Sequence, residues 1–327
     1  MCGVTGFIDF ARQTPVHTGL ALAEYMAAAI RHRGPDDGGT WDDAAHGVFL
    51  AHRRLSIVDL SAAGHQPMAS ASGRYVIVFN GEVYNHGEIR QRLASFSWRG
   101  NSDTEVMLAA IEQWGLEAAL QQFVGMFAFA LWDRQATSLT LVRDRFGEKP
   151  LYWGQFGSTL LFGSELKAMK QHPAFVGAVN RDALASYMTY GYLPGVASIY
   201  EHVQKLQPGS MRVFQADGSS REQVYWSAVD AAVDAGANEF AGDDTAAANQ
   251  LEQLITNSVR QQLLADVPVG AFLSGGVDSS TIVALAQAHS RTPVKTFTIG
   301  FEEAGYNEAV YAEQVAKHLG KIGRAHV

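Results

Sequence analysis

The sequence has a single cysteine, Cys2, among its 327 residues, so no disulfide can form within the chain. It also lacks any apolar run near the roughly 20 residues of a membrane span. The longest candidate, residues 124–132, is typical of a buried core segment. No basic stretch followed by an apolar one stands at the N-terminus, so no signal peptide is expected. These absences argue against a membrane protein and favour a cytoplasmic one.

Basic residues are in the minority: 25 Lys and Arg stand against 33 Asp and Glu, which gives a net charge of −8. Because phosphate binding needs a basic face, this balance argues against nucleic acid as the main partner. The hydrophobic share of 47% is that of an ordinary globular chain, so a full core can be built. At about 150 residues per domain, the length predicts two domains.

Residues 2–210 are rich in short β-type runs separated by turn residues, and two helical stretches interrupt them. The expected helices cover 20–31 and 104–114, and the expected strands cover 3–10, 47–50, 74–80, 126–132, 139–143 and 160–163. The second helix opens with Ser102-Asp103-Thr104-Glu105, which predicts a capping box with Ser102 as N-cap and Glu105 at N3. Strands with a few helices predict an α+β domain.

The chain changes character in the segment 211–245, where Ala, Asp and Gly dominate from 227 to 244, and we expect a connection there. Apolar residues then recur at helical spacing from Leu251 to Leu263. A buried-strand pattern (267–273), a helical run (279–289), a strand (296–301) and a helix (309–319) follow. This order predicts that 246–320 is the opening of a parallel α/β sheet.

The last residues, 322–327, are what the codons ATC GGA AGA GCA CAC GTC would encode, which resembles a sequencing-library adapter. We therefore expect residues 321–327 to be a non-native read-through tail, and the fold is predicted without them.

Cys2 follows the initiator methionine directly. If Met1 is removed, the thiol lies beside a free α-amine, whose unperturbed pKa near 7.7–8.0 lets it act as a base. A cysteine needs only modest help to become a nucleophilic thiolate, so one residue could supply both nucleophile and base. A Met-Cys start by itself is more often an incidental buried cysteine, so the assignment depends on other motifs.

Those motifs occur in order along the first domain: MCGVTG (1–6), RHRGPDD (31–37), RLSIVD (54–59), NGEVYN (80–85) and SDTE (102–105). Together they resemble the glutaminase domain of class II glutamine amidotransferases, which are N-terminal-nucleophile hydrolases. The resemblance covers Cys2 to Gly209. Residues 143–152 (RDRFGEKPLY) and 162–165 (FGSE) look like the asparagine synthetase branch. The resemblance to the glutaminase domain implies an α+β N-terminal-nucleophile hydrolase sandwich with αββα layers.

The resemblance also implies roles in glutamine hydrolysis. The Asn80 amide and the Gly81 N–H would stabilise the tetrahedral oxyanion, with Cys2 as nucleophile. A guanidinium suits the glutamine α-carboxylate and a carboxylate suits its α-ammonium, which are the roles of Arg54 and Asp103. The expected glutamine site comprises Arg54, Leu55, Ile57, Asn80, Gly81, Glu82 and Asp103.

Structural interpretations compete with these roles. Asn80-Gly81 is a common hairpin turn, and Asp103 could merely favour a helix N-terminus. We interpret the segment 32–35 as architecture, and His52 and His65 as structural.

Ser274–Ser280 (SGGVDSS) follows the strand 267–273 and precedes a helix. Backbone N–H groups, two glycines and a helix N-terminus suit an anion. The Gly-Lys-Ser/Thr ending of a Walker loop is missing, and the loop resembles the pyrophosphate loop of enzymes that split ATP into AMP and pyrophosphate. Asp278 is expected to hold Mg²⁺ through its carboxylate.

By the same resemblance, Leu273 and Ile299 would frame the adenine or ribose at strand ends, where open α/β sheets place ligands. The residues expected around the pyrophosphate are Ser274, Gly275, Gly276, Ser279 and Ser280. The second part would thus be the start of an α/β parallel-sheet ATP-pyrophosphatase domain.

The resemblance implies a ligase, a glutamine-dependent asparagine synthase with glutamine, aspartate and ATP as substrates. Aspartate would react with ATP to β-aspartyl-AMP, which ammonia released at Cys2 would attack. Two alternatives stay open: an amidotransferase for another acceptor, such as a sugar or a secondary-metabolite carboxylate, and a glutaminase-like sensor or interaction protein without catalysis. A homodimer is compatible with the family. The family's aspartate-binding residues fall beyond Gly320, so we expect this chain to hydrolyse glutamine without making asparagine.

Overall fold

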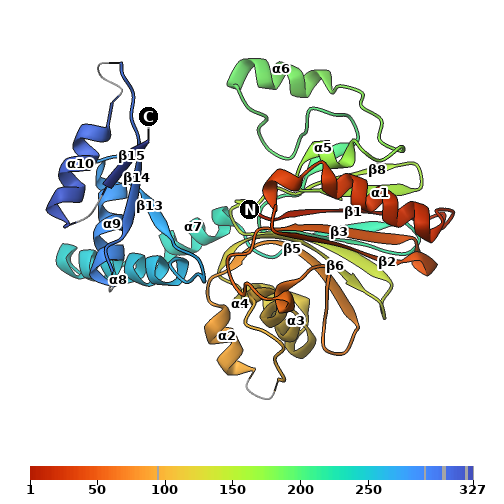
Figure 1. Ribbon diagram of the computed structural model, residues 1–327, viewed down its shortest axis with the longest axis horizontal. Coiled ribbons are helices and arrows are strands. Elements are labelled where there is room, and N and C mark those ends of the chain that lie inside the picture. Colours follow the sequence, from red (N-terminus) through yellow and green to blue (C-terminus); the bar gives the residue numbers. More distant parts are fainter. Residues whose placement is uncertain (94–95, 291, 304–306, 321–322, 327) are drawn as a thin grey trace. The chain divides into compact units, whose positions relative to one another are not determined.

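The computed structural model describes residues 1–93, 96–290, 292–303, 307–320 and 323–326. The chain divides into two compact units, Met1–Ala237 and Asn238–Val327. Figure 1 labels their helices and strands. Within the described ranges, no helix has the length and apolar character needed to cross a membrane.

The first unit is built on two antiparallel sheets, each of six strands within the described residues. Sheet A has the order β10 (Val203–Lys205), β8 (Tyr152–Phe156), β9 (Thr159–Gly163), β1 (Gly3–Asp9), β3 (Val48–Arg54) and β2 (Asp37–Asp43). Sheet B has the order β12 (Ser220–Val224), β11 (Ser210–Phe214), β7 (Ser138–Arg143), β6 (Gly125–Asp133), β5 (Tyr75–Val83) and β4 (Met68–Ala69).

Helices cover the outer faces of both sheets, which gives αββα layers (Figure 1). Sheet A packs against α1 (Val16–Ala28) and α5 (Leu166–Met169) through a cluster around Phe7 and Phe49. Sheet B packs against three helices: α2 (His86–Arg92), α3 (Asp103–Trp114) and α4 (Leu116–Gln122). This layering confirms the α+β sandwich with αββα layers expected from the sequence.

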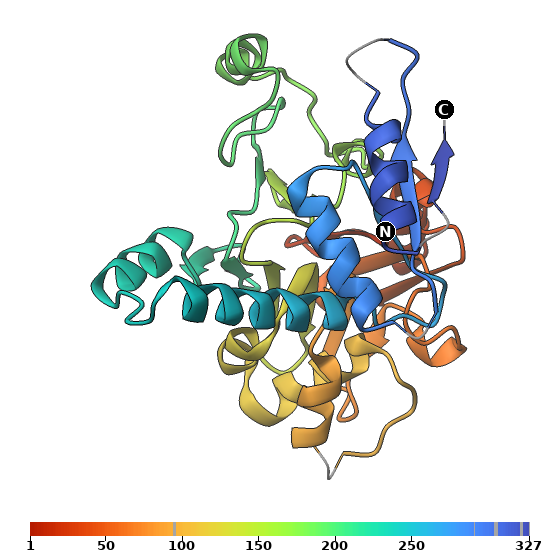
Figure 2. The ribbon, with the colours of Figure 1, turned by 90° about the vertical axis from the view of Figure 1, so that its left-hand side faces the viewer.

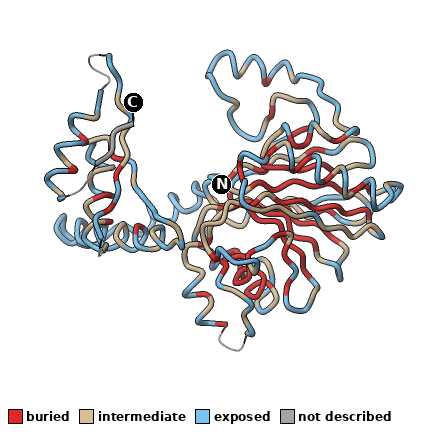
Figure 3. The backbone as a smooth tube through the Cα atoms, in the orientation of Figure 1, coloured by how far each residue is buried: buried red, intermediate tan, exposed pale blue. Residues whose placement is uncertain are grey.

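A third apolar cluster fills the space between the two sheets. Side chains alternate along a strand, so one face of each strand points into this space. Leu50 of β3 and Val78 of β5 both belong to the cluster and are fully buried. Figure 3 shows the buried residues concentrated along the strands of the first unit.

The start of α3 agrees only partly with the predicted capping box. Ser102 is the N-cap, and its hydroxyl accepts a hydrogen bond from the N–H of Glu105. The Glu105 carboxylate does not return to the Ser102 N–H; it accepts from the N–H groups of Arg99 and Gly100. The glutamate therefore fastens the loop before the helix.

The connection between the units is shorter in structure than the segment 211–245 expected from the sequence. Residues 210–224 contribute β11 and β12 to sheet B. The first unit then continues through α7 (Ala228–Ala237). The remaining helix of this unit, α6 (Arg181–Tyr190), buries only Ala183 among its residues.

The second unit has the parallel α/β order that the sequence predicts. Its elements are α8 (Asp244–Gln262), β13 (Gly270–Phe272), α9 (Val277–Ala288), β14 (Lys295–Ile299), α10 (Ala309–His318) and β15 (Gly323–His326). The strands are parallel in the order β13-β14-β15, and Figure 2 shows α8 beside α9. Within the expected read-through tail, residues 321, 322 and 327 lie outside the described residues, and β15 is formed by the rest.

The predicted buried strand 267–273 is reduced to β13. Phe272 is 80% exposed, whereas the next residue, Leu273, is 2% exposed. Leu273 contributes to a small cluster with Val283 of α9 and two alanines of α10. Only one side of this strand end is therefore covered by apolar residues within the described part of the unit.

Candidate active site

The site of the first unit lies where the space between the sheets changes from apolar to polar. Along β3, Leu50 is followed on the same face by His52 and Arg54; along β5, Val78 is followed by Asn80 and then Glu82. A cavity of about 120 Å³ lies at this end. It is lined by Met1, Cys2, Arg54, Leu55, Ile57, Val58, Gly64, Gln66, Phe79, Asn80, Gly81, Glu82, Ser102, Asp103, Thr104, Met126 and Lys149.

All residues predicted for the glutamine site are among these lining residues, although they come from distant parts of the chain. Cys2 precedes β1, Arg54 ends β3, Asn80 lies in β5, and Asp103 is the first residue of α3. The two sheets and the helix layer on sheet B bring them together.

The Cys2 thiol is held by the backbone of Leu55. The Leu55 N–H donates to Sγ at 3.4 Å, and the thiol donates to the Leu55 carbonyl at 3.6 Å. Burial raises the pKa of the thiol, and the Leu55 hydrogen bond and the N-terminal charge oppose this. The thiol is thus fixed at the cavity wall but needs a base before it can attack.

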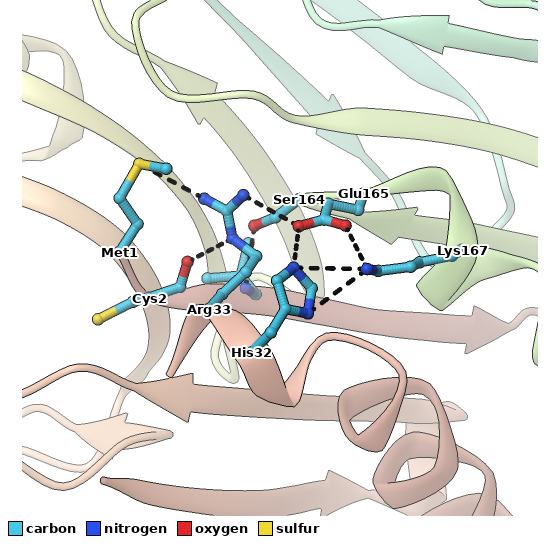
Figure 4. A network of polar contacts seen from close by, with 8 residues as sticks. Met1, Cys2, His32, Arg33, Ser164, Glu165 and Lys167 are labelled. Atoms are coloured by element: carbon cyan, nitrogen blue, oxygen red, sulfur yellow. Dashed lines mark hydrogen bonds and ion pairs between the residues drawn. The ribbon is translucent and has the colours of Figure 1, made fainter. Parts of the chain in front are cut away.

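A network of charged side chains also holds the backbone of Cys2 (Figure 4). Arg33 donates from Nε to the Cys2 carbonyl at 2.8 Å and from Nη1 to Glu165 at 3.2 Å. Glu165 also contacts His32 at 2.9 Å and Lys167 at 3.1 Å. Burial would raise the pKa of Glu165, but hydrogen bonds from these three partners lower it more. The segment 32–35, expected to be architectural, therefore holds the backbone of Cys2 through Arg33.

Asn80 is fully buried, and neither atom of its side-chain amide has a hydrogen-bond partner among the described residues. A buried amide without partners is costly unless a ligand supplies them. Because this amide lines the cavity that contains Cys2, it is available to an oxygen of a bound substrate.

Glycine is required at position 81 because β5 and β6 pack closely there. A Cβ built on Gly81 would lie 2.2 Å from the carbonyl oxygen of Met126 and 2.6 Å from the Cα of Phe127. Glycine at this position therefore allows the close approach of β6.

Arg54 is 6% exposed and already binds the loop that follows it. Its guanidinium donates to the carbonyls of Val58, Asp59 and Ser61, which uses three of its five N–H groups. Gly64 makes room for it, because a Cβ there would lie 1.9 Å from Nη2. Arg54 therefore shapes the cavity wall as well as placing positive charge in it.

Two acidic side chains, Glu82 and Asp103, also line the cavity. The Asp103 carboxylate accepts hydrogen bonds from the N–H groups of Val83 at 2.9 Å and Thr104 at 2.8 Å. Burial raises the pKa of Asp103, and it also raises the pKa of Glu82, to which the charge of Asp103 adds. A cationic group bound between them would favour their charged forms.

Several lining residues were not predicted, above all Lys149, Gln66 and Met126. Lys149 is 6% exposed, and burial lowers its pKa. Its loop is held by Asp144, whose carboxylate accepts from the N–H groups of Phe146, Glu148 and Lys149 itself. The motif RDRFGEKPLY was recognised, but only the fold shows that its lysine reaches the cavity.

The predicted pyrophosphate loop of the second unit turns back on itself. The hydroxyls of Ser274 and Ser279 lie 2.9 Å apart, and the Ser279 hydroxyl also accepts from the Ser274 N–H at 3.2 Å. Gly275 has a φ of 85°, a conformation that favours glycine. Gly276 is the N-cap of α9. The turn therefore lies directly before the N-terminus of α9.

The nucleotide residues predicted at strand ends are also brought together. Leu273 follows β13, and Ile299 ends the neighbouring parallel strand β14. The Leu273 N–H donates to the carbonyl of Phe297 at 2.9 Å, and the Thr298 hydroxyl donates to the Leu273 carbonyl at 2.6 Å. The two positions thus share one edge of the sheet, although Ile299 is 62% exposed.

Asp278 lies in the first turn of α9, and Ser280 has a buried hydroxyl without a partner in the described part of the chain. No group of three or more His, Cys, Asp or Glu that could hold a metal occurs among the described residues. One carboxylate near hydroxyls still fits Mg²⁺, which usually keeps waters and binds substrate phosphates beside one or two carboxylates.

Comparison with protein families agrees with the division of the chain into two units. A model of the family described as glutamine amidotransferase domain matches residues 1–226. A model of the family described as asparagine synthase matches residues 250–326.

Known relatives match almost the whole chain. Asparagine synthetase [glutamine-hydrolyzing] 3 of Bacillus subtilis is 36% identical over 93% of this chain and 48% of its own length. Asparagine synthetase [glutamine-hydrolyzing] 1 of the same organism is 34% identical over 98% of this chain and 49% of its own. The chain thus spans about half the length of the curated relatives it matches.

A solved structure supports the fold alone. The glutamine phosphoribosylpyrophosphate amidotransferase of Bacillus subtilis covers 99% of this chain and 90% of its own, with a TM-score of 0.52 and 15% identity. The family match over residues 1–226, together with the named relatives, settles the classification. This chain belongs to the family described as glutamine amidotransferase domain.

Proposed function

We propose that the first unit hydrolyses the side-chain amide of glutamine at Cys2. The observation that carries the proposal is the unpartnered Asn80 amide in the cavity that contains the Cys2 thiol. An amide hydrolase needs a nucleophile and a preorganised donor for the oxyanion in one pocket. Arg54 and Asp103 on the cavity walls suit the α-carboxylate and the α-ammonium of free glutamine.

The reaction follows from these positions. The α-amine of Cys2 takes the thiol proton, Sγ attacks the amide carbon, and the C=O electrons move onto the oxygen. The Asn80 amide and the Gly81 N–H donate to this oxyanion. The amine then returns its proton to the leaving nitrogen as the C–N bond breaks. This releases ammonia and leaves a thioester, which water hydrolyses to glutamate and free thiol.

This mechanism requires removal of Met1, since Cys2 has no free amine before that. Burial lowers the pKa of the Met1 amine, and the charges of Arg33 and Lys149 lower it further. We expect the new amine at Cys2, one residue along, to experience the same positive charges. A lower pKa would leave more of this amine neutral and able to accept the thiol proton.

We further propose that the second unit serves ATP-dependent amidation of aspartate through β-aspartyl-AMP, with ammonia from Cys2. The support is the match of residues 250–326 to the asparagine synthase family and the Ser274–Ser280 turn at the N-terminus of α9. In this proposal Ser274, Gly275, Gly276, Ser279 and Ser280 surround the pyrophosphate. Asp278 would hold Mg²⁺, which would offset the phosphate charge.

Glutamate and ammonia release from glutamine tests the glutaminase. Intact mass should show a chain that begins at Cys2, and this chain should be active. Cys2→Ala should be folded and inactive, and a chain with a residual N-terminal extension should be inactive although its thiol is intact. The matched control carries the same extension at the C-terminus. An active extended chain would contradict the role of the amine.

The acceptor is tested on the complete gene product that contains these residues. With ATP, Mg²⁺ and glutamine, aspartate should stimulate release of AMP and pyrophosphate and give asparagine. Glutamine hydrolysis without any aspartate-dependent pyrophosphate would exclude aspartate while leaving the glutaminase standing.

A further inference from the structure

On one of its two edges, β5, the strand that carries Asn80, has no partner strand beyond Ile77 among the residues that the structure describes. β4 pairs with β5 only at Val76 and Ile77, so Phe79 lies beyond the last paired position on this edge. A strand edge without a partner leaves backbone N–H and C=O groups to be satisfied elsewhere. At Phe79, side chains satisfy both groups.

Gln66 and His52 take the place of the missing strand. The Phe79 N–H donates to Gln66 Oε1 at 2.7 Å, and His52 Nε2 donates to the Phe79 carbonyl at 2.9 Å. His52 is 1% exposed and Gln66 is 4% exposed, so water does not compete for these bonds. Side chains therefore hold both backbone polar groups of Phe79, the residue immediately before Asn80.

The same contacts link the elements that carry the glutamine-binding residues. His52 lies two residues before Arg54 on the same face of β3. Gln66 Nε2 donates to the Thr104 hydroxyl at 3.3 Å, and Thr104 follows Asp103 in α3. The hydrogen bonds of His52 and Gln66 thus connect β3, β5 and α3 around Phe79.

His52 must carry a proton on Nε2, because the Phe79 carbonyl can only accept a hydrogen bond. Its Nδ1 is buried without a partner within the described residues. Burial lowers the pKa of His52 to about 4, with the nearby charge of Arg54 acting in the same direction. The imidazole is therefore neutral at pH 7, with its single proton on Nε2. His52 itself does not line the cavity, so it does not touch the substrate.

We infer that His52 and Gln66 are positioning residues of the glutaminase: by holding both backbone groups of Phe79 they fix the Asn80 amide where the oxyanion forms. The inference rests on the proposed hydrolysis at Cys2. It replaces the structural assignment that the sequence suggested for His52. Oxyanion donors act through preorganisation, and a displacement of about 1 Å can lower the rate by ~10²-fold.

The first test compares His52→Leu with His52→Gln. Leucine cannot donate to the Phe79 carbonyl, so kcat for glutamine hydrolysis should fall by ~10-fold or more while KM stays within about twofold. KM should be spared because Arg54 and Asp103 bind the ground state and the transition state alike. A glutamine at this position can again donate an N–H, so His52→Gln should recover most of kcat.

His172 supplies the matched control, because it is also buried with a nitrogen that lacks a partner in the described chain. It packs on Phe7 at 4.5 Å, outside the cavity. His172→Leu should change stability without changing kcat. Gln66→Leu, which removes the acceptor for the Phe79 N–H, should reproduce the kcat effect of His52→Leu. All variants are assayed well below their melting temperatures.

The outcomes separate the two proposals. An active wild type whose kcat is unaffected by His52→Leu would overturn the positioning role alone. The same holds if His172→Leu lowers kcat equally, or if His52→Gln fails to recover activity although folded. An inactive wild type would overturn the hydrolysis and the positioning role together.

Discussion

Cys2 Sγ accepts a hydrogen bond from the backbone N–H of Leu55 at 3.4 Å and lies 3.6 Å from the carbonyl oxygen of the same residue. One backbone unit therefore orients the thiol without supplying a base. Burial is the largest influence on the pKa of this thiol and raises it, while the Leu55 hydrogen bond opposes the shift. The raised pKa favours the protonated thiol, which agrees with the proposed mechanism in which the α-amine accepts its proton.

Alkylation tests this resting state in a chain that keeps Met1. Since Cys2 is the only cysteine, iodoacetamide uptake reports this thiol alone. The raised pKa should make uptake at pH 7 slower than for free cysteine, with the rate rising toward alkaline pH. Mass spectrometry over a pH series measures the rate, and Cys2→Ser serves as blank. A midpoint below that of free cysteine would contradict the described burial.

Asn80→Ala should lower kcat far more than it changes KM. The amide has no partner in the described residues until a substrate oxygen arrives, so its loss is felt in the transition state. Removal of one oxyanion donor typically costs ~10²–10³ in rate. Steady-state kinetics of glutamate release gives both constants. An Asn80→Ala enzyme with a normal kcat would remove this residue from the oxyanion site.

Arg54→Ala should raise KM for glutamine and also lower the melting temperature. The first effect follows from loss of the charge that faces the α-carboxylate, and the second from three loop carbonyls left without a donor. Arg54→Lys keeps the charge but not the fork of donors, so it should recover KM more than stability. Unchanged KM in a folded Arg54→Ala variant would place the carboxylate elsewhere.

The sequence predicted the parts of the site that motifs and local patterns specify. Ser102 caps α3 because a short hydroxyl side chain before an apolar helical run satisfies free N–H groups at close range. Strands such as β1 and β5 were expected because their apolar residues are dense. β2 was missed, since its residues Asp37–Asp43 are polar and glycine-rich and pair with β3 through long-range contacts.

The remaining residues of the site depend on contacts between segments that no local pattern reveals. Gln66 reaches Phe79 across 13 positions of the chain, and His52 reaches it across 27. A lone histidine in a strand is more often structural, and its position beside the Asn80 strand appears only when two sheets face each other. Lys149 enters the cavity for the same reason, through the loop held by Asp144.

His172→Phe should flatten the loss of stability between pH 6.5 and 4. Burial lowers the pKa of His172 to about 4 in the folded state, whereas an unfolded histidine titrates near 6.5. The unfolded chain therefore binds the proton first as the pH falls through this window, which destabilises the fold by up to ~3 kcal/mol. Urea titrations at pH 7 and pH 5 measure the difference, which should shrink in the variant. A difference as large as that of the wild type would mean that His172 is charged in the folded state. His52, which keeps its own low pKa, should leave part of the pH dependence in place.

Gly81→Ala should damage both stability and glutamine hydrolysis, because the added methyl meets the backbone of β6 rather than open space. The Cβ would lie 2.2 Å from the Met126 carbonyl oxygen, so β5 and β6 must separate where Gly81 pairs with Phe127. Overpacking of this kind typically costs ~1–3 kcal/mol. The matched control is Gly87→Ala in α2, where a Cβ meets nothing within 4 Å. There alanine should leave activity unchanged and raise stability by up to ~1 kcal/mol, because it is the better helix former. Thermal unfolding followed by circular dichroism, with glutamate release on the same samples, compares the two. A Gly81→Ala variant as stable and active as Gly87→Ala would show that the two strands are not packed this closely beside Asn80.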